Sequence, residues 1–197
     1  MSAERRYDSR RFQIEESTTQ NGGARTIFIE TMPPGTTVPP HFHTRFAETF
    51  DLIRGSITVY TSTTPDLNVL GSSAKELEVG NPIKVEPQLY HTYRVGGTSD
   101  DDLATVRVIL TPGDPDFERL LKILNGLDGD GDLEGVGDSV VLMAVIMGLS
   151  DAHAIGPAKD LLDGVRAEKT EEIEALKTKL LQKYDTEEAL KALLMSS

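Results

Sequence analysis

The chain has 197 residues, of which 38% are hydrophobic and 26% charged, and it contains no cysteine. This composition is typical of one soluble globular domain with an appendage, and it excludes disulfide bonds. The net charge is −12: residues 1–112 carry 11 basic and 14 acidic side chains, and residues 113–197 carry 9 and 18. Because such a chain repels phosphate backbones, we expect no nucleic-acid partner.

Membrane insertion and export are also not expected. The longest apolar run, Val140 to Met147, is far shorter than a bilayer requires. The polar start, MSAERRYDSRR, lacks the apolar core of a secretory signal. We therefore expect a cytoplasmic protein.

Residues 1–24 are predicted to form an N-terminal arm, and short strands with frequent turns are predicted from Arg25 to Leu110. Alternating or β-branched segments are separated by Gly, Pro and polar residues every eight to twelve positions, a pattern typical of a sandwich or closed barrel. The expected strands are Arg25–Thr31, Glu48–Arg54, Ser56–Tyr60, Glu76–Val79, Pro82–Val85, His91–Val95 and Ala104–Leu110.

Two histidines stand at the start of this region, at positions 41 and 43. In an extended chain, residues i and i+2 point to the same face, so His41 and His43 reach into one space. Glu48 follows five residues later, and His91 follows a later strand break. Imidazole nitrogen and carboxylate oxygen are ligands that zinc, iron, manganese and nickel accept. These four residues are the predicted ligands of one divalent transition metal (Fe, Mn, Ni or Zn).

The segment from Gly35 to Gly55 resembles the first motif of the cupins, which is Gly, five residues, His-x-His, three or four residues, Glu, six residues, Gly. The second cupin motif is matched in part, because Gly80 and His91 keep its spacing. Gln88 replaces its Gly, Pro87 comes one place late after Glu86, and Val95 replaces its Asn. We therefore expect a different turn before His91. The resemblance covers about residues 25–111.

The resemblance implies a mainly β fold, a cupin-type double-stranded β-helix (jelly-roll) barrel over residues 25–112. Cupins with three histidines and one glutamate include dioxygenases, isomerases and decarboxylases, so the resemblance implies a metal-dependent enzyme acting on a small organic molecule. Dioxygenase-type chemistry is favoured, with Glu48 as a ligand that also moves a proton. The alternative is a non-catalytic module that binds a small ligand or a metal, because one fold hosts many functions.

Strand parity extends the predicted site beyond the metal ligands. If Glu48 points into the barrel, Phe50 and Leu52 point the same way, and Tyr93 accompanies His91. Core packing is the simpler interpretation of these three residues. Side chains beside a metal inside a small barrel can also line a substrate pocket, so Phe50, Leu52 and Tyr93 are the candidate pocket residues.

Residues 113–197 are predicted to form a helical extension. Asp114 with Pro115 starts the first helix, which Gly126 is expected to end, and Asp138 is expected to cap an apolar helix over Ser139–Met147. A weaker helix is predicted over Pro157–Val165 and an amphipathic one over Thr170–Tyr184, and Asp185 with Glu188 forms a predicted capping box for the last helix.

Two further features of the extension are not expected to be functional sites. The acidic stretch 128–134 resembles the start of a calcium loop but lacks its later Gly and Glu, so a surface loop is expected. His153 is expected to be structural or exposed in a helical linker.

The many apolar helix faces would exceed what one barrel can cover, which predicts a homodimer. The competing arrangement folds the extension over its own barrel.

Overall fold

The computed structural model describes residues 11–99, 101–132 and 139–194, and within them the chain forms two antiparallel five-stranded sheets. The first sheet contains, in spatial order, β1 (Phe12–Glu16), β2 (Thr26–Met32), β9 (Ala104–Thr111), β4 (Ala47–Arg54) and β7 (Ile83–Val85). The second contains β10 (His153–Ala154), β3 (His41–Phe42), β8 (Tyr90–Val95), β5 (Ile57–Ser62) and β6 (Lys75–Glu76). The two sheets form a cupin-type double-stranded β-helix, which confirms the predicted fold class.

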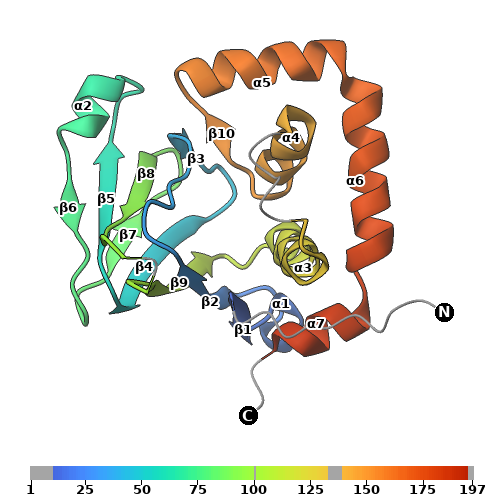
Figure 1. The fold of residues 1–197 in the computed structure, drawn as a ribbon, viewed down its shortest axis with the longest axis horizontal. Coiled ribbons are helices and arrows are strands. Elements are labelled where there is room, and N and C mark those ends of the chain that lie inside the picture. The colour runs from blue at the N-terminus through green and yellow to red at the C-terminus, as the bar shows by residue number, and fades with distance from the viewer. Residues whose placement is uncertain (1–10, 100, 133–138, 195–197) are drawn as a thin grey trace.

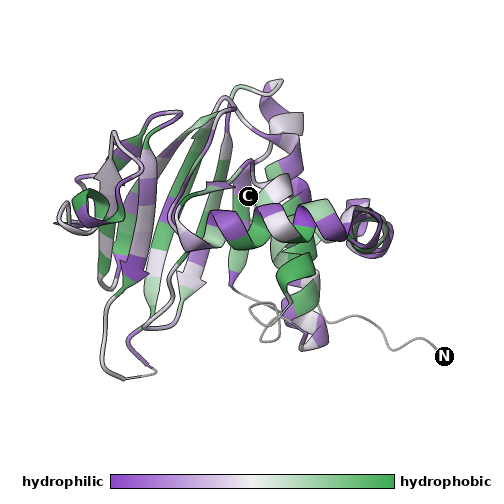
Figure 2. Ribbon diagram, turned by 90° about the horizontal axis from the view of Figure 1, so that it is seen from above, coloured by the Kyte–Doolittle hydropathy of each residue, from purple (hydrophilic) through white to green (hydrophobic). Residues whose placement is uncertain are grey.

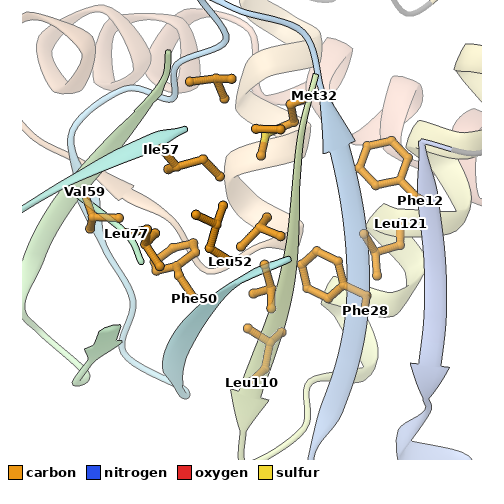
Figure 3. Packing of buried hydrophobic residues seen from close by; sticks show 14 of the residues in the cluster. Phe12, Phe28, Met32, Phe50, Leu52, Ile57, Val59, Leu77, Leu110 and Leu121 are labelled. Atoms are coloured by element: carbon orange, nitrogen blue, oxygen red, sulfur yellow. The ribbon is translucent and has the colours of Figure 1, made fainter. Parts of the chain in front are cut away.

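Alternation along the strands determines which side chains face the space between the sheets (Figure 2). On β4, Glu48, Phe50 and Leu52 are buried, whereas Thr49 and Asp51 between them are partly exposed. Both sheets contribute to one apolar core, in which Phe28 and Phe50 of the first sheet share a cluster with Ile57, Val59 and Val95 of the second (Figure 3). This inward face therefore also receives the predicted metal ligand of β4.

The sheets include strands outside the expected barrel limits of residues 25–112. β1 lies in the part predicted as an N-terminal arm, yet it pairs with β2 along the edge of the first sheet. β10 comes from the C-terminal extension and pairs with β3, with His153 opposite Phe42. His153 thus lies in a short strand and not in a helical linker, and it is exposed as predicted.

The helices are α1 (Thr18–Asn21), α2 (Leu67–Gly71), α3 (Pro115–Asp130), α4 (Val140–Leu149), α5 (Pro157–Glu168), α6 (Thr170–Tyr184) and α7 (Glu187–Leu193). The last five cover one side of the barrel, with α3 and α4 between the sheets and α6 (Figure 1). No helix in the described ranges is long and apolar enough to cross a membrane.

The predicted end of the first long helix at Gly126 is wrong, because α3 continues to Asp130 and Gly131 ends it at φ 77°. A Cβ on Gly126 would lie 2.0 Å from the ring of Tyr184. Gly126 therefore permits the close approach of α3 and α6 and does not terminate the helix. The acidic stretch 128–134 was expected to be a loop, but Asp130 is in the helix and accepts a hydrogen bond from the Tyr184 hydroxyl at 2.8 Å. Residues 133–138 lie outside the described part.

Two helix starts differ from expectation. Ser139 caps α4 by accepting a hydrogen bond from the Leu142 amide, and the expected cap Asp138 lies outside the described residues. Thr186, and not Asp185, caps α7. Asp185 instead forms ion pairs with Lys122 and Arg119 of α3. Asp185 therefore forms ion pairs with a distant helix and does not form the predicted capping box.

The helical extension is also anchored to the barrel by a buried carboxylate. Glu118 of α3 is 5% exposed. It accepts hydrogen bonds from the Ser17 hydroxyl (2.7 Å), the Thr18 amide (2.7 Å) and the Thr26 hydroxyl (2.8 Å). These donors lie around α1 and at the start of β2, so one side chain joins the extension to the first sheet.

The apolar faces of the extension are covered within the chain, which removes one argument for the predicted homodimer. Leu120, Leu180 and Leu193 are buried, and α3 and α7 pack on the barrel core. The homodimer stays a prediction that rests on the open edges of the two sheets and on the frequency of two-fold symmetry. Light scattering on the full chain at micromolar concentration is expected to give a dimer mass, and a monomer mass would contradict it.

Candidate metal centre

Four buried side chains from neighbouring strands converge between the sheets. His41 lies on β3, directly opposite His91 of β8 in the register of the second sheet. His43 follows β3 by one residue on the same side, and Glu48 enters from β4 of the first sheet. The four ligand atoms lie within 4.8 Å of one another, and each residue is buried. The structure therefore brings together all four predicted ligands.

The hydrogen bonds of the imidazoles orient their Nε2 atoms toward this common centre. The Nδ1 atoms of His41, His43 and His91 lie 2.7, 3.2 and 3.1 Å from the backbone carbonyls of Pro39, Asp151 and Leu89. Because a carbonyl oxygen only accepts, Nδ1 carries the hydrogen in each ring. Each neutral ring therefore presents the Nε2 lone pair to the centre, which is the arrangement that metal-ligating histidines have.

The atoms that meet at the centre are all acceptors. Nε2 of His43 lies 3.2 Å from Nε2 of His41 and 3.4 Å from Oε2 of Glu48, which in turn lies 3.2 Å from Nε2 of His91. Lone pairs at such distances repel unless a cation lies among them. The donor set of three imidazoles and one carboxylate therefore fits a divalent transition metal.

The pKa values show how strongly these groups interact. Burial and the neighbouring His91 and His43 rings hold the pKa of His41 well below its usual range. Burial also opposes the charge of His43, but the neighbouring Glu48 carboxylate raises the pKa of this histidine overall. For Glu48, burial alone would raise the pKa, and the neighbouring His43 and His91 rings lower it. Glu48 is therefore held as a carboxylate, the form that binds a metal.

A residue of the helical extension, Asp151, contacts one of these predicted ligands from outside the centre. Asp151 follows α4 and has a φ of 52°, which is uncommon for a residue with a side chain. Its backbone carbonyl accepts from His43 Nδ1, and its carboxylate accepts from the Arg45 amide at 2.7 Å and from the Thr44 amide and hydroxyl. The extension thus orients a predicted metal ligand, a role that no local sequence motif indicates.

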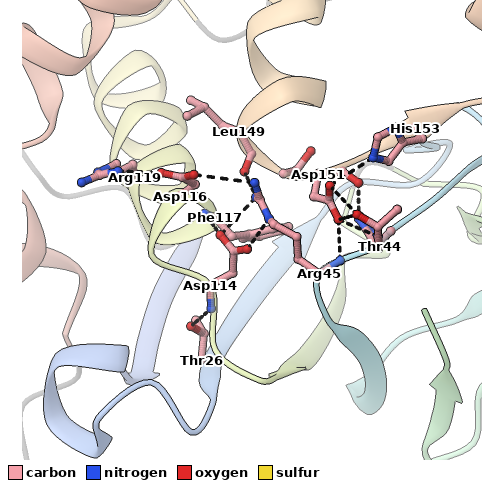
Figure 4. A network of polar contacts seen from close by, with 12 residues as sticks. Thr26, Thr44, Arg45, Asp114, Asp116, Phe117, Arg119, Leu149, Asp151 and His153 are labelled. Carbon is pink, nitrogen blue, oxygen red and sulfur yellow. Dashed lines mark hydrogen bonds and ion pairs between the residues drawn. The ribbon is translucent and has the colours of Figure 1, made fainter. Parts of the chain in front are cut away.

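Arg45 joins the loop between β3 and β4 to the start of α3 and to the end of α4. Its guanidinium pairs with Asp114, the N-cap of α3, at 2.7 Å, and donates to the Leu149 carbonyl at the end of α4 at 2.9 Å (Figure 4). The loop between β3 and β4 is therefore held on one side by the barrel and on the other by α3 and α4.

We expect Asp151→Ala to lower metal affinity by about tenfold to a hundredfold, the usual effect of removing support from a metal ligand. The loss of the carboxylate frees the amides of Thr44 and Arg45, and alanine fits the positive φ poorly. Competition with a chromogenic chelator measures the affinity. Asp151→Asn is the matched control, because asparagine tolerates this backbone and keeps one acceptor, and an equal loss in both variants would contradict the prediction.

The turn before His91 keeps a feature of the second cupin motif despite its different residues. Gln88 has a φ of 67°, a conformation that favours glycine, which is the residue of the motif at this position. The Gln88 amide donates to the His43 carbonyl at 2.7 Å. This contact between the two motifs accounts for a strained residue in the turn.

An apolar cavity of about 330 Å³ opens from the four ligands toward the helices. Phe50 and Tyr93 line it, whereas Leu52, also predicted as a pocket residue, is buried in the core and is not among the lining residues. Helices α3 and α4 close the cavity with Phe117, Leu121, Leu124, Met143 and Ile146. Periodicity predicted these helices, but nothing in their sequence indicated that they form a wall of the site.

The chain forms two antiparallel sheets, and both histidine segments and Glu48 converge between them. The chain has the fold of the cupin superfamily. Comparison of the sequence with protein-family models gives no match, and comparison with curated proteins gives none either.

Solved structures with a similar cupin barrel have low identity to this chain. A protein from Bacillus halodurans is 13% identical over 47% of this chain and 65% of its own length, just under two thirds, with a TM-score of 0.41. An RmlC-like cupin family protein with a double-stranded β-helix fold, from Methanocaldococcus jannaschii, is 16% identical over 55% and 87%, with a TM-score of 0.39. The polyketide cyclase RemF from Streptomyces resistomycificus is 17% identical over 53% and 66%, with a TM-score of 0.41. These values describe a likeness of fold and do not bear on activity.

Proposed function

We propose that this cupin is a metal-dependent enzyme that acts on a small organic molecule, with dioxygenase-type chemistry favoured over isomerisation or decarboxylation. The observation that carries the proposal is the position of the four ligands at the end of an apolar cavity. Four protein ligands leave open positions on a five- or six-coordinate metal, and in this protein the cavity lies next to them.

The residues around the centre have separate tasks in this proposal. His41, His43, Glu48 and His91 would hold the metal, which supplies Lewis acidity and a site for dioxygen or a substrate oxygen. Glu48 lies beside the cavity and could take up or return a proton at the metal. Phe50 and the helix side chains bind the apolar part of the substrate and exclude water, which strengthens the electrostatic interactions inside.

The second candidate function is a non-catalytic module that holds a small ligand or a metal. The apolar wall that α3 and α4 add to the cavity favours it, because an apolar lining binds a small ligand whether or not a reaction follows.

Elemental analysis of the full chain purified without added metal tests the proposal. We expect about one transition-metal ion per chain, because the described residues contain one such four-ligand group. Dioxygen uptake by the iron-loaded or manganese-loaded protein with a panel of small aromatic substrates would then support dioxygenase-type chemistry. A bound metal without turnover on any substrate class would favour the binding module, and a chain that takes up no metal would contradict the proposal.

A further inference from the structure

A second ionisable group faces the interior of the barrel, away from the metal centre. Glu30 lies on β2 with the same parity as the buried Phe28 and Met32, so its side chain points between the sheets and lines the cavity. The proposed reaction does not use this carboxyl group. A carboxyl group placed in an apolar interior is costly and indicates a specific interaction.

Glu30 has neighbours that make a small polar group at this end of the cavity. Its Oε1 lies 3.5 Å from the guanidinium of Arg11, and the Tyr93 hydroxyl nearby donates to Met32 Sδ at 3.3 Å. Burial raises the pKa of Glu30 to about 7, although Arg11 acts in the opposite direction. We refer to Glu30, Arg11 and Tyr93 as the distal polar group.

The sheet register separates the distal polar group from the metal centre. Glu30 lies in the cross-strand row of Val106 and Leu52, whereas Glu48 lies in the row of Leu110. The backbones of Glu30 and Glu48 are therefore four residues apart along the strands, which is roughly 14 Å. They are two strands apart across the sheet, which is roughly 10 Å. Phe50 lies between, with its ring 6.3 Å from that of His91 and 5.9 Å from that of Tyr93. The cavity is thus apolar in the middle and polar at two ends.

The charges at the distal end select the kind of ligand group that fits. A ligand carboxylate would meet the carboxyl group of Glu30, and a ligand ammonium would place a second cation beside the one that Arg11 already provides. A neutral hydroxyl avoids both conflicts. The Glu30 carboxylate can accept about four hydrogen bonds in all, so acceptor capacity remains beside Arg11.

We propose that the ligand is a small molecule with an apolar body and a neutral hydroxyl group, and that this hydroxyl donates a hydrogen bond to Glu30 while the other end of the molecule faces the metal centre. This inference rests on the proposed function for the metal end, but the distal contact does not depend on metal. Glu30 is therefore a specificity-determining residue.

The test compares two probes that differ by one hydroxyl, 3-phenyl-1-propanol and propylbenzene, on the full chain as purified and after treatment with a chelator. Calorimetric titration above about pH 8, where Glu30 with its pKa of about 7 is mostly ionised, gives the ratio of their dissociation constants. We expect Glu30→Leu to reduce the relative preference for the alcohol by about tenfold, the usual effect of losing a hydrogen bond to a charged acceptor. Glu30→Gln, which keeps the shape and one acceptor oxygen, is expected to lose part of this preference.

Glu15→Leu is the matched control. Glu15 lies on the neighbouring strand β1, where its carboxylate pairs with Arg107 and does not line the cavity, so the ratio should not change. A ratio that stays the same in Glu30→Leu, or in Glu30→Gln should the leucine variant not fold, would overturn the proposal. So would a failure of both probes to bind at millimolar concentration. A chelator-treated chain that keeps the Glu30-dependent preference would support the distal contact. A chain that takes up no metal at all but shows the same preference would contradict the proposed enzyme and still support the distal contact.

Discussion

His43→Ala is expected to abolish metal binding and to lower the melting temperature by roughly 10 °C. Nε2 of His43 lies close to two other predicted ligands, 3.2 Å from Nε2 of His41 and 3.4 Å from the Glu48 carboxylate. A metal that binds only the folded chain stabilises it by about 3–4 kcal/mol when present at a hundred to a thousand times its dissociation constant. For a chain of this length, each kcal/mol corresponds to about 2–4 °C.

Metal content by elemental analysis and melting by calorimetry measure this effect. His153→Ala is the matched control, because His153 lies nearby on β10 but is half exposed and belongs to no ligand cluster among the described residues. A chelator should lower the melting temperature of the unmodified chain and of the control, and should leave His43→Ala unchanged. If His43→Ala retains both its metal and its melting temperature, the centre does not bind metal through this residue.

Glu118→Ala is expected to reduce the free energy of unfolding by about 3–5 kcal/mol, because a buried donor that loses its acceptor costs about 1–3 kcal/mol and three donors bind this carboxylate. The substitution leaves the Thr18 amide and the hydroxyls of Ser17 and Thr26 without their acceptor in a buried place. It also removes the hydrogen bonds of Glu118 that join α3 to the first sheet, so the wall of the cavity should loosen. Denaturant unfolding measures the change.

The control for this variant is Glu172→Ala on the exposed surface of α6, where the carboxylate pairs only loosely with Lys169 in solvent. Exposed pairs of this kind contribute about 0–1 kcal/mol, so the control should unfold almost as the unmodified chain does. A loss below about 1 kcal/mol in Glu118→Ala would show that the extension is held by its apolar contacts alone.

The sequence by itself determined the four predicted metal ligands, which the structure brings together, and most secondary structure, because both depend on short-range geometry. The two-residue spacing of His41 and His43 and the parity of Glu48 and Phe50 follow from the pleat of a strand. The amphipathic pattern over Thr170–Tyr184 gave the bounds of α6 as the structure has them. Such features need no knowledge of distant residues.

The tertiary structure decided the features that depend on which distant segments meet. Gly126 has the local character of a helix end, but the ring of Tyr184 packs against it inside α3. Asp185 has the spacing of a helix cap, but its charge pairs with Lys122 and Arg119. In both places an interaction with a distant element outweighs a local preference of about 1 kcal/mol.

The surroundings of the metal centre belong to the same class. Asp151 is far from His43 in the sequence, and only the folding of α4 onto the barrel brings its carbonyl to the imidazole. Glu30 is one acidic residue in a strand until the register places it inside the cavity. Spacing along the chain therefore specifies the ligands, whereas the packing of the extension on the barrel determines which residues orient those ligands and what the cavity can bind.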